Sequence, residues 1–180
     1  MEQKKQVRIS VRALVEFVLR SGDIDNRRSG AAQKDAMAAG TRIHKKIQKR
    51  MGGNYRAEVP LKYAALDEEE DIELLVEGRA DGIFEEDGIV TIDEIKGVYM
   101  DLERLTEPVA VHMAQAMCYG YFYCCDKDLD GIRLQMTYCN LETEEIKRFQ
   151  TDRSREELET WFSGVVHEYF KWRGTSTTMS

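Results

Sequence analysis

Apolar residues recur every three or four positions in several stretches of the chain, and this spacing predicts amphipathic helices. In other stretches apolar and polar residues alternate, which predicts half-buried strands. The predicted helices cover residues 11–20, 31–51, 107–123 and a last segment that follows the capping-box pair Ser154 and Glu157. The predicted strands cover residues 55–65, 72–84, 89–95, 132–140 and 144–150, and residues 7–10 form a short strand or an extended lead-in. This order predicts one α/β domain over residues 1–173 and a polar, disordered tail over residues 174–180.

The two central strands carry charged residues that a hairpin would bring together. Asp87-Gly88 lies between these strands and is a strong signal for a two-residue turn. A turn there places Asp81 opposite Glu94, and the alternation of side chains puts Lys96 on the same face as Glu94. Directly opposed like charges destabilise a strand pair. The pattern therefore indicates that a divalent cation compensates the two carboxylates.

The composition is typical of a globular protein, with 42% hydrophobic and 33% charged residues among 180. No apolar run approaches the roughly 20 residues that cross a bilayer, and the charged start does not lead into a signal peptide. We therefore expect a cytoplasmic protein without a membrane partner. The net charge of −7 argues against tight nonspecific binding to nucleic acid, although a local groove can still bind DNA.

The four cysteines lack the C-x-x-C spacing of common metal sites. They are Cys118, Cys124, Cys125 and Cys139. Because a cytosolic chain keeps its thiols reduced, we expect these residues to be ordinary core thiols.

Four motifs occur in an order that resembles the RecB-like branch of the PD-(D/E)XK nuclease superfamily. They are Gly40…His44, Asp81 within Gly78-Arg79-Ala80-Asp81, Glu94-Ile95-Lys96, and Gln115…Tyr119. Each motif alone is weak, and the four together are much more specific. The resemblance implies a restriction-endonuclease-like core, which is an α/β fold with a central mixed β-sheet flanked by helices. The predicted element order contains the α-β-β-β-α-β arrangement of that core.

The resemblance also implies a metal site. Asp81, Glu94, the carbonyl of Ile95 and His44 would bind Mg²⁺ or Mn²⁺. Oxygen ligands suit both ions, and the imidazole favours Mn²⁺. Apart from the resemblance, a lone histidine such as His44 on a partly apolar helix face is more often a packed core residue, and Gly40 on the same face would permit close packing.

Three further residues would act beside the metal. Lys96 would help to deprotonate the attacking water or would hold the scissile phosphate, and the sequence does not decide between these roles. Gln115 and Tyr119 would hold a DNA phosphate or Lys96, and the alternative for both is packing between helices. Glu58 can be a surface glutamate or can help to position the water.

Basic residues recur along one face of the predicted helix 31–51. They are Arg42, Lys45, Lys46, Lys49 and Arg50. Such a face is often only solvated. The functional alternative is a ridge that contacts DNA phosphates next to the site.

The resemblance bears on cofactors and partners as well. Some RecB-like exonucleases hold an iron–sulfur cluster with one early and three late cysteines, but no cysteine precedes Cys118 here, so we expect no cluster. The opening VRISVRALVEFVLRSGDID is similar to nuclease domains fused ahead of DinG/XPD-type helicases. The chain has no Walker A motif. DNA and a helicase domain or subunit are therefore the expected partners.

These patterns predict metal-dependent hydrolysis of DNA phosphodiester bonds, by an exonuclease or flap-type nuclease of DNA repair that can form one domain of a larger helicase–nuclease. Two alternatives stay open. One is a noncatalytic module that grips DNA or braces a helicase, and the other is a dimeric, structure-specific resolvase. A covalent mechanism lacks support, because no nucleophile motif accompanies His44, His112 and His167.

Overall fold

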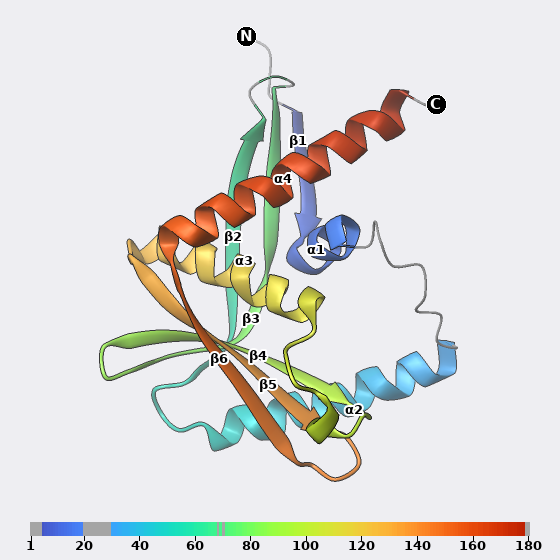
Figure 1. Cartoon of the computed structure of the whole chain (residues 1–180), viewed down its shortest axis with the longest axis vertical. Helices are drawn as coiled ribbons and strands as arrows, with labels where there is room; N and C mark the ends of the chain where they lie inside the picture. Colours follow the sequence, from blue (N-terminus) through green and yellow to red (C-terminus); the bar gives the residue numbers. More distant parts are fainter. Residues whose placement is uncertain (1–4, 20–29, 68, 70, 179–180) are drawn as a thin grey trace.

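The computed structural model describes residues 5–19, 30–67, 69 and 71–178. For residues 30–39 and 174–178 it describes the backbone and not the side chains. Its elements follow the predicted order closely (Figure 1). They are β1 (Lys5–Ser10), α1 (Val11–Leu19), α2 (Gly30–Arg50), β2 (Arg56–Asp67), β3 (Ile72–Glu86), β4 (Ile89–Val98), a 3₁₀ turn (Leu102–Arg104), α3 (Ala110–Lys127), β5 (Gly131–Asn140), β6 (Ile146–Ser154) and α4 (Arg155–Thr178). The end of the predicted first helix, with the loop that follows, lies outside the described residues.

The strands form one six-stranded sheet in the order β1-β3-β4-β5-β6, and β2 pairs with β3. The β1–β3 and β4–β5 pairs are parallel, and the other pairs are antiparallel. Helices lie against both faces of this sheet (Figure 1). The predicted α/β fold with a central mixed sheet flanked by helices is therefore confirmed, and it is consistent with a restriction-endonuclease-like core.

Side-chain alternation along β4 separates two hydrophobic clusters. Ile92 belongs to the main core, which α1, α3 and α4 cover. Ile95 faces the other way and packs with Ile43 and Ile47 of α2 and with Cys139 of β5. The predicted apolar stripe of α2 is therefore what attaches this helix to the sheet. Figure 1 shows α3 and α4 crossing one side of the strands, with α2 (light blue) beneath the β4–β6 end.

The central hairpin has the predicted register. Gly82 pairs with Asp93, and the pairs continue to the turn. Asp87 and Gly88 adopt φ of 54° and 79°, the left-handed values that a two-residue turn of this kind requires. Gly82–Asp93 is the last pair of this ladder. One residue beyond it, β3 and β4 part and each strand continues with a different neighbour.

Local capping agrees with the sequence at two helix starts. The Ser10 hydroxyl accepts from the backbone N–H of Ala13 at 3.0 Å and caps α1. At α4, Ser154 Oγ accepts from the Glu157 N–H at 3.0 Å, and Glu157 Oε1 accepts from the Ser154 N–H at 3.1 Å. This is the predicted capping box.

Three local expectations differ from the structure. The alternation of side chains along β2 is interrupted at Glu58, which has φ of 55°. The side chains before and after Glu58 therefore do not follow one continuous alternation between the two faces of the sheet. A Cβ at Gly40 would meet no atom within 4 Å, so this glycine does not serve close packing. Helix α4 continues through residues 174–178, assigned above to a disordered tail, because extending a formed helix costs little compared with starting one.

Candidate active site

The site begins where β3 and β4 part. Asp81 and Glu94 lie next to the last ladder pair, and the two residues are only 8% and 3% exposed. The Asp81 N–H donates to Glu94 Oε1 at 3.4 Å, and the Ile95 N–H donates to Asp81 Oδ2 at 2.7 Å. Side-chain oxygens therefore take the place of backbone carbonyls where the ladder stops. The result is a pair of buried carboxylates in direct contact.

Burial shifts the acidity of both groups. Desolvation raises the pKa of Asp81, while His44, the Ile95 N–H and Lys96 act in the opposite direction. Desolvation also raises the pKa of Glu94 well above its ordinary value, and repulsion from Asp81 adds to this increase. Two such groups resist being ionised together unless positive charge is supplied.

Helix α2 contributes two side chains, His44 and Gln48, one turn apart on one face. His44 Nδ1 lies 3.7 Å from Asp81 Oδ1. Gln48 Nε2 donates to the backbone oxygen of Asp81 at 2.9 Å and to Glu58 Oε1 at 3.1 Å. The predicted approach of His44 from the long helix is thus observed. Gln48 was missed, although its place four residues after His44 was a usable signal.

Helix α3 approaches the carboxylates from the opposite face of the sheet. Gln115 Oε1 accepts a hydrogen bond from Lys96 Nζ at 2.6 Å. Tyr119 packs over Gly78, where a Cβ would lie 2.5 Å from the tyrosine hydroxyl. Burial raises the pKa of Tyr119, with smaller contributions from Glu94 and Asp81, so its hydroxyl stays protonated near the carboxylates.

His112, near the start of α3, belongs to a different arrangement. Its Nδ1 lies 2.9 Å from the hydroxyl of Tyr138, which also accepts from the Val109 N–H at 3.0 Å. Burial lowers the pKa of His112 to about 4, so the ring is neutral at physiological pH. His112 therefore helps to hold the start of α3 against β5.

The donor chemistry of the site suits a hard divalent cation. Asp81 and Glu94 offer carboxylate oxygens, Ile95 a carbonyl, and His44 an imidazole. Within the described part of the chain, however, no three His, Cys, Asp or Glu side chains are gathered closely enough to hold a metal ion. A cation would therefore have to draw His44 and the carboxylates together. It would also supply the positive charge that the buried pair lacks.

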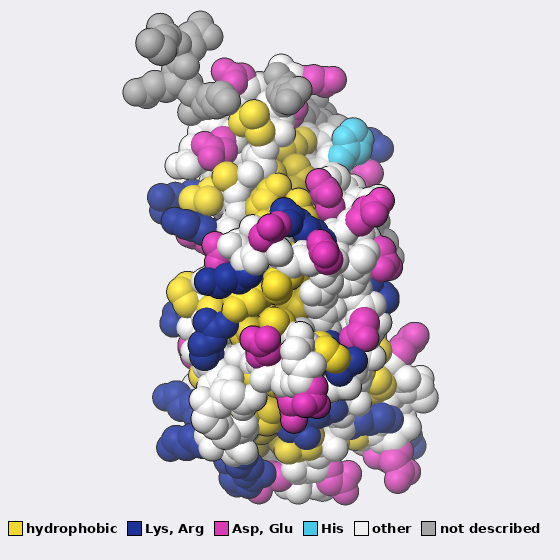
Figure 2. Space-filling view, turned by 90° about the vertical axis from the view of Figure 1, so that its left-hand side faces the viewer, with side chains coloured by type: hydrophobic (Ala, Val, Ile, Leu, Met, Phe, Trp, Pro, Cys, Tyr) yellow, Lys and Arg dark blue, Asp and Glu magenta, His cyan; other side chains and the backbone are white. Residues whose placement is uncertain are grey.

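The predicted basic ridge on α2 is mostly separate from this cluster. Arg42, Lys45, Lys49 and Arg50 are exposed, and Lys46 forms an ion pair with Glu144. Figure 2 shows one face of the molecule on which Lys and Arg side chains gather along the left margin, while acidic side chains predominate toward the right. The charge of this acidic chain is thus unevenly distributed.

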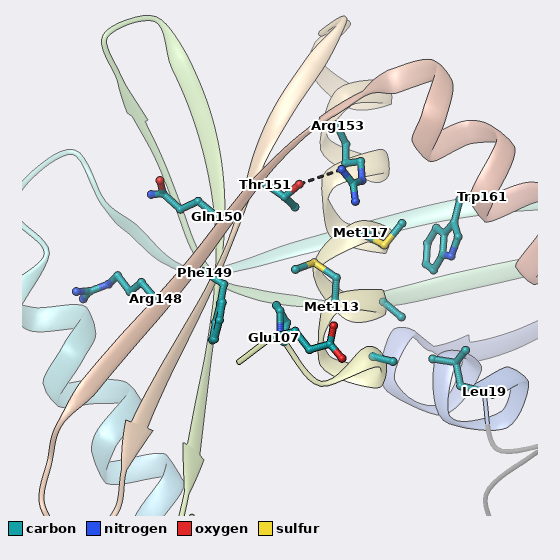
Figure 3. A pocket seen from close by; sticks show the side chains of 13 residues that line it. Leu19, Glu107, Met113, Met117, Arg148, Phe149, Gln150, Thr151, Arg153 and Trp161 are labelled. Carbon is teal, nitrogen blue, oxygen red and sulfur yellow. Dashed lines mark hydrogen bonds between the residues drawn. The ribbon is translucent and has the colours of Figure 1, made fainter. Parts of the chain in front are cut away.

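A cavity of about 680 Å³ lies apart from the carboxylates, between α3, β6 and α4. Figure 3 shows Met113, Met117, Phe149 and Trp161 around it. Gln115 and Tyr119 do not line this cavity. Its mainly apolar walls offer no converging set of acids and bases, so the carboxylate cluster is the better candidate for chemistry.

The cysteines agree with the prediction of core thiols. All four are free, and Cys118, Cys124 and Cys139 are buried. Burial raises the pKa of Cys124 to about 11, which keeps this thiol protonated. In the region that the structure describes, no helix is long and apolar enough to span a membrane.

Comparisons with known proteins identify the fold. No family model matches the chain, and no curated protein matches it. The chain is similar to the crystal structure of SSO0001, with a TM-score of 0.57 and 15% identity over 93% of this chain and 78% of the other. It is more distantly similar to the alkaline exonuclease LHK-Exo from Laribacter hongkongensis, with a TM-score of 0.42 and 7% identity over 96% and 95% of the two chains. The likeness to SSO0001 shows a shared fold, and that to the exonuclease is too distant to carry an argument.

Proposed function

We propose that this chain is a metal-dependent deoxyribonuclease. The observation that carries the proposal is the pair of buried carboxylates, Asp81 and Glu94, in contact where β3 and β4 part. Burying two acids together costs free energy. A site that holds a divalent cation gives this arrangement a use, because the cation favours the ionised form of both groups.

Asp81, Glu94, the Ile95 carbonyl and His44 would hold Mg²⁺ or Mn²⁺. The bound cation would supply Lewis-acid chemistry, activating water and neutralising charge on the phosphate. Gln48 fixes the backbone of Asp81 from α2, so the ligand is oriented from both its side chain and its main chain.

Lys96 supplies the remaining positive charge of the site. Desolvation raises the pKa of both Asp81 and Glu94, and the charge of the Lys96 ammonium partly offsets this increase. Gln115 accepts from this ammonium and limits its movement. Lys96 would either hold a non-bridging oxygen of the scissile phosphate or transfer a proton from the attacking water. Tyr119, with a protonated hydroxyl, would donate to a neighbouring phosphate oxygen.

The exposed basic residues of α2 support DNA as the substrate. The helix that supplies His44 also carries Arg42, Lys45, Lys49 and Arg50 on its exposed side. A strand held along this ridge would pass the site. We further propose an exonuclease or flap-type activity in DNA repair, as part of or together with a helicase, in the cytoplasm.

The test uses DNA labelled at the 5′ or 3′ end, as single strands, duplexes and flaps, with Mg²⁺ or Mn²⁺. Wild-type protein should shorten at least one substrate, and Asp81→Asn should not. Asp152→Asn is the matched control, because this exposed carboxylate lies on β6 outside the cluster and pairs with Arg133 of β5. Tight DNA binding without cleavage by wild-type protein would favour the noncatalytic module instead. Paired nicks in branched DNA by a dimer would favour the resolvase.

A further inference from the structure

Asp93 precedes Glu94 and points to the opposite face of β4. Its side chain is fully buried, with 0% exposure. Its carboxylate accepts three hydrogen bonds: from Tyr55 Oη at 2.7 Å, from Thr137 Oγ1 at 2.6 Å and from Gln135 Nε2 at 3.1 Å. A buried carboxylate costs several kcal/mol unless it is well satisfied, so these three hydrogen bonds are what allow Asp93 to be buried.

The donors come from two separate parts of the fold. Thr137 and Gln135 lie on β5, and the Gln135 oxygen in turn accepts from Gln150 of β6 at 2.6 Å. Tyr55 precedes β2, on the other side of β3. The carboxylate of Asp93 therefore ties one half of the sheet to the other across the β3–β4 boundary.

Tyr55 also covers the strand that carries Asp81. A Cβ at Gly82 would overlap the ring and hydroxyl of Tyr55, so the ring lies directly on that glycine. The ring stacks on Phe84 of the same strand, with centroids 5.9 Å apart. Burial, followed by the charge of Asp93, raises the pKa of Tyr55, which keeps its hydroxyl a donor.

The clamped residues adjoin the carboxylate pair. Gly82 and Asp93 form the last pair of the β3–β4 ladder. Asp81 and Glu94 are the next residue on each strand, beyond the end of the β3–β4 ladder, and Glu94 pairs with Met136 of β5 instead. The distance between these two carboxylates is consequently set by how firmly the last pair is held.

We propose that Asp93 and Tyr55 are positioning residues that fix the spacing of Asp81 and Glu94; their importance for catalysis rests on the proposed nuclease function. Three directional hydrogen bonds to one carboxylate define a single geometry, whereas apolar packing at the same place would allow small slips. The two carboxylates are thereby held at one spacing, and a cation would still have to draw His44 toward them.

The test compares Tyr55→Phe, which keeps the ring and loses the hydroxyl, with Tyr63→Phe. The control also loses a half-buried hydroxyl contact, to Tyr121 at 3.2 Å, but away from the site. Amide hydrogen exchange is measured at Ile95 and Asp81, whose N–H groups donate to the carboxylates. Exchange at Leu134, in the fully buried part of β5, serves as the internal reference for global unfolding.

In Tyr55→Phe and in Asp93→Asn, exchange at Ile95 and Asp81 should accelerate about 10-fold more than at Leu134. In Tyr63→Phe the exchange rates of the three amides should change by the same factor. Equal acceleration at all three amides in Tyr55→Phe would overturn the proposal and leave a role in general stability. These readouts do not require the protein to cut DNA.

A second measurement connects the clamp to activity. The Mn²⁺ concentration for half-maximal cleavage should rise about 10-fold in Tyr55→Phe and stay unchanged in Tyr63→Phe. An unchanged requirement in Tyr55→Phe would overturn the catalytic part of the proposal. Absence of any cleavage by wild-type protein would instead refute the nuclease proposal, while the exchange experiment would still decide whether the clamp exists.

Discussion

Asp81 and Lys96 lie beside each other, but substitutions of the two residues should have different effects on metal binding and cleavage. Asp81→Asn removes a charged ligand, so Mn²⁺ affinity and cleavage should both collapse. Lys96→Met removes a positive charge and no ligand, so Mn²⁺ should bind at least as well as to wild-type protein. The rate of cleavage by Lys96→Met should nevertheless fall by ~10²–10⁴-fold, a typical loss when proton transfer or electrostatic stabilisation is removed.

Calorimetric titration of Mn²⁺ into both variants, beside cleavage of labelled DNA, separates the two roles. Near wild-type cleavage by Lys96→Met would mean that Lys96 is not the catalytic lysine. The spacing of Glu94-Ile95-Lys96 would then be a coincidence.

Because the pKa of Glu94 is raised in the folded state, the free energy of unfolding of the metal-free protein should depend on pH in a known direction. Since the folded state binds a proton that the unfolded state has already released, Glu94 favours folding below its ordinary pKa. This contribution is lost as the pH rises through the raised pKa. The free energy of unfolding of wild-type protein, relative to Glu94→Gln, should therefore fall as the pH increases above about 4.5. Urea titrations in EDTA from pH 4 to pH 8 measure this difference.

Glutamine does not titrate, so the variant controls for groups that do not interact with Glu94, while the altered repulsion of Asp81 is part of the measured difference. Added Mn²⁺ should restore the stability of wild-type protein at high pH, because the cation favours the ionised carboxylates. Parallel curves for the two proteins in EDTA would contradict the burial of a protonated Glu94.

Two glycines of neighbouring elements should respond oppositely to alanine. Gly40→Ala in α2 should raise the free energy of unfolding by about 0.5–1 kcal/mol, because its methyl group enters open space and alanine favours a helix. Gly82→Ala in β3 should lower it by about 1–3 kcal/mol, since Tyr55 occupies the position of the new Cβ. Denaturant titration measures both changes. Stabilisation by Gly82→Ala would show that Tyr55 does not lie on β3 as described.

The elements of the fold could be predicted because each depends on neighbouring residues in the sequence. The Asp87-Gly88 turn determines the register of the hairpin, and that register alone brings Asp81 and Glu94 together. Ile43 and Ile47 likewise follow from the period of α2. Local patterns were sufficient wherever the contact partners were fixed by period or by a turn.

The remainder of the site depends on contacts that no local pattern encodes. Tyr55 and Asp93 meet only because β2 and β4 lie on opposite sides of β3. Periodicity assigned Tyr55 to a regular strand, whereas it precedes β2 and turns toward Asp93. The interrupted alternation of side chains at Glu58 also needs tertiary contacts to stabilise it, because a left-handed φ is unfavourable for glutamate in isolation.

At the scale of the whole molecule, the question is how a chain of net charge −7 holds DNA. Repulsion from the acidic surface should weaken binding in general, so affinity must come from a local cluster of cations. Lys45 and Lys49 are exposed one turn apart on α2, and neither forms an ion pair with an acid among the described residues. The ridge is therefore the surface on which a phosphate contact would have the largest effect.

The double variant Lys45→Glu, Lys49→Glu should weaken binding of duplex DNA. The slope of log affinity against log salt is negative, and its magnitude should decrease by about 2, roughly one for each lost phosphate contact. The control is Lys5→Glu, Lys127→Glu, which produces the same net charge at exposed positions on β1 and α3. Fluorescence anisotropy measures the slopes between about 50 and 200 mM salt, a range over which loss of phosphate contacts changes DNA affinity strongly. Since both variants share one net charge, a global effect would shift them equally. A reduced slope in the ridge variant alone would identify α2 as the helix that both supplies His44 and holds the DNA backbone.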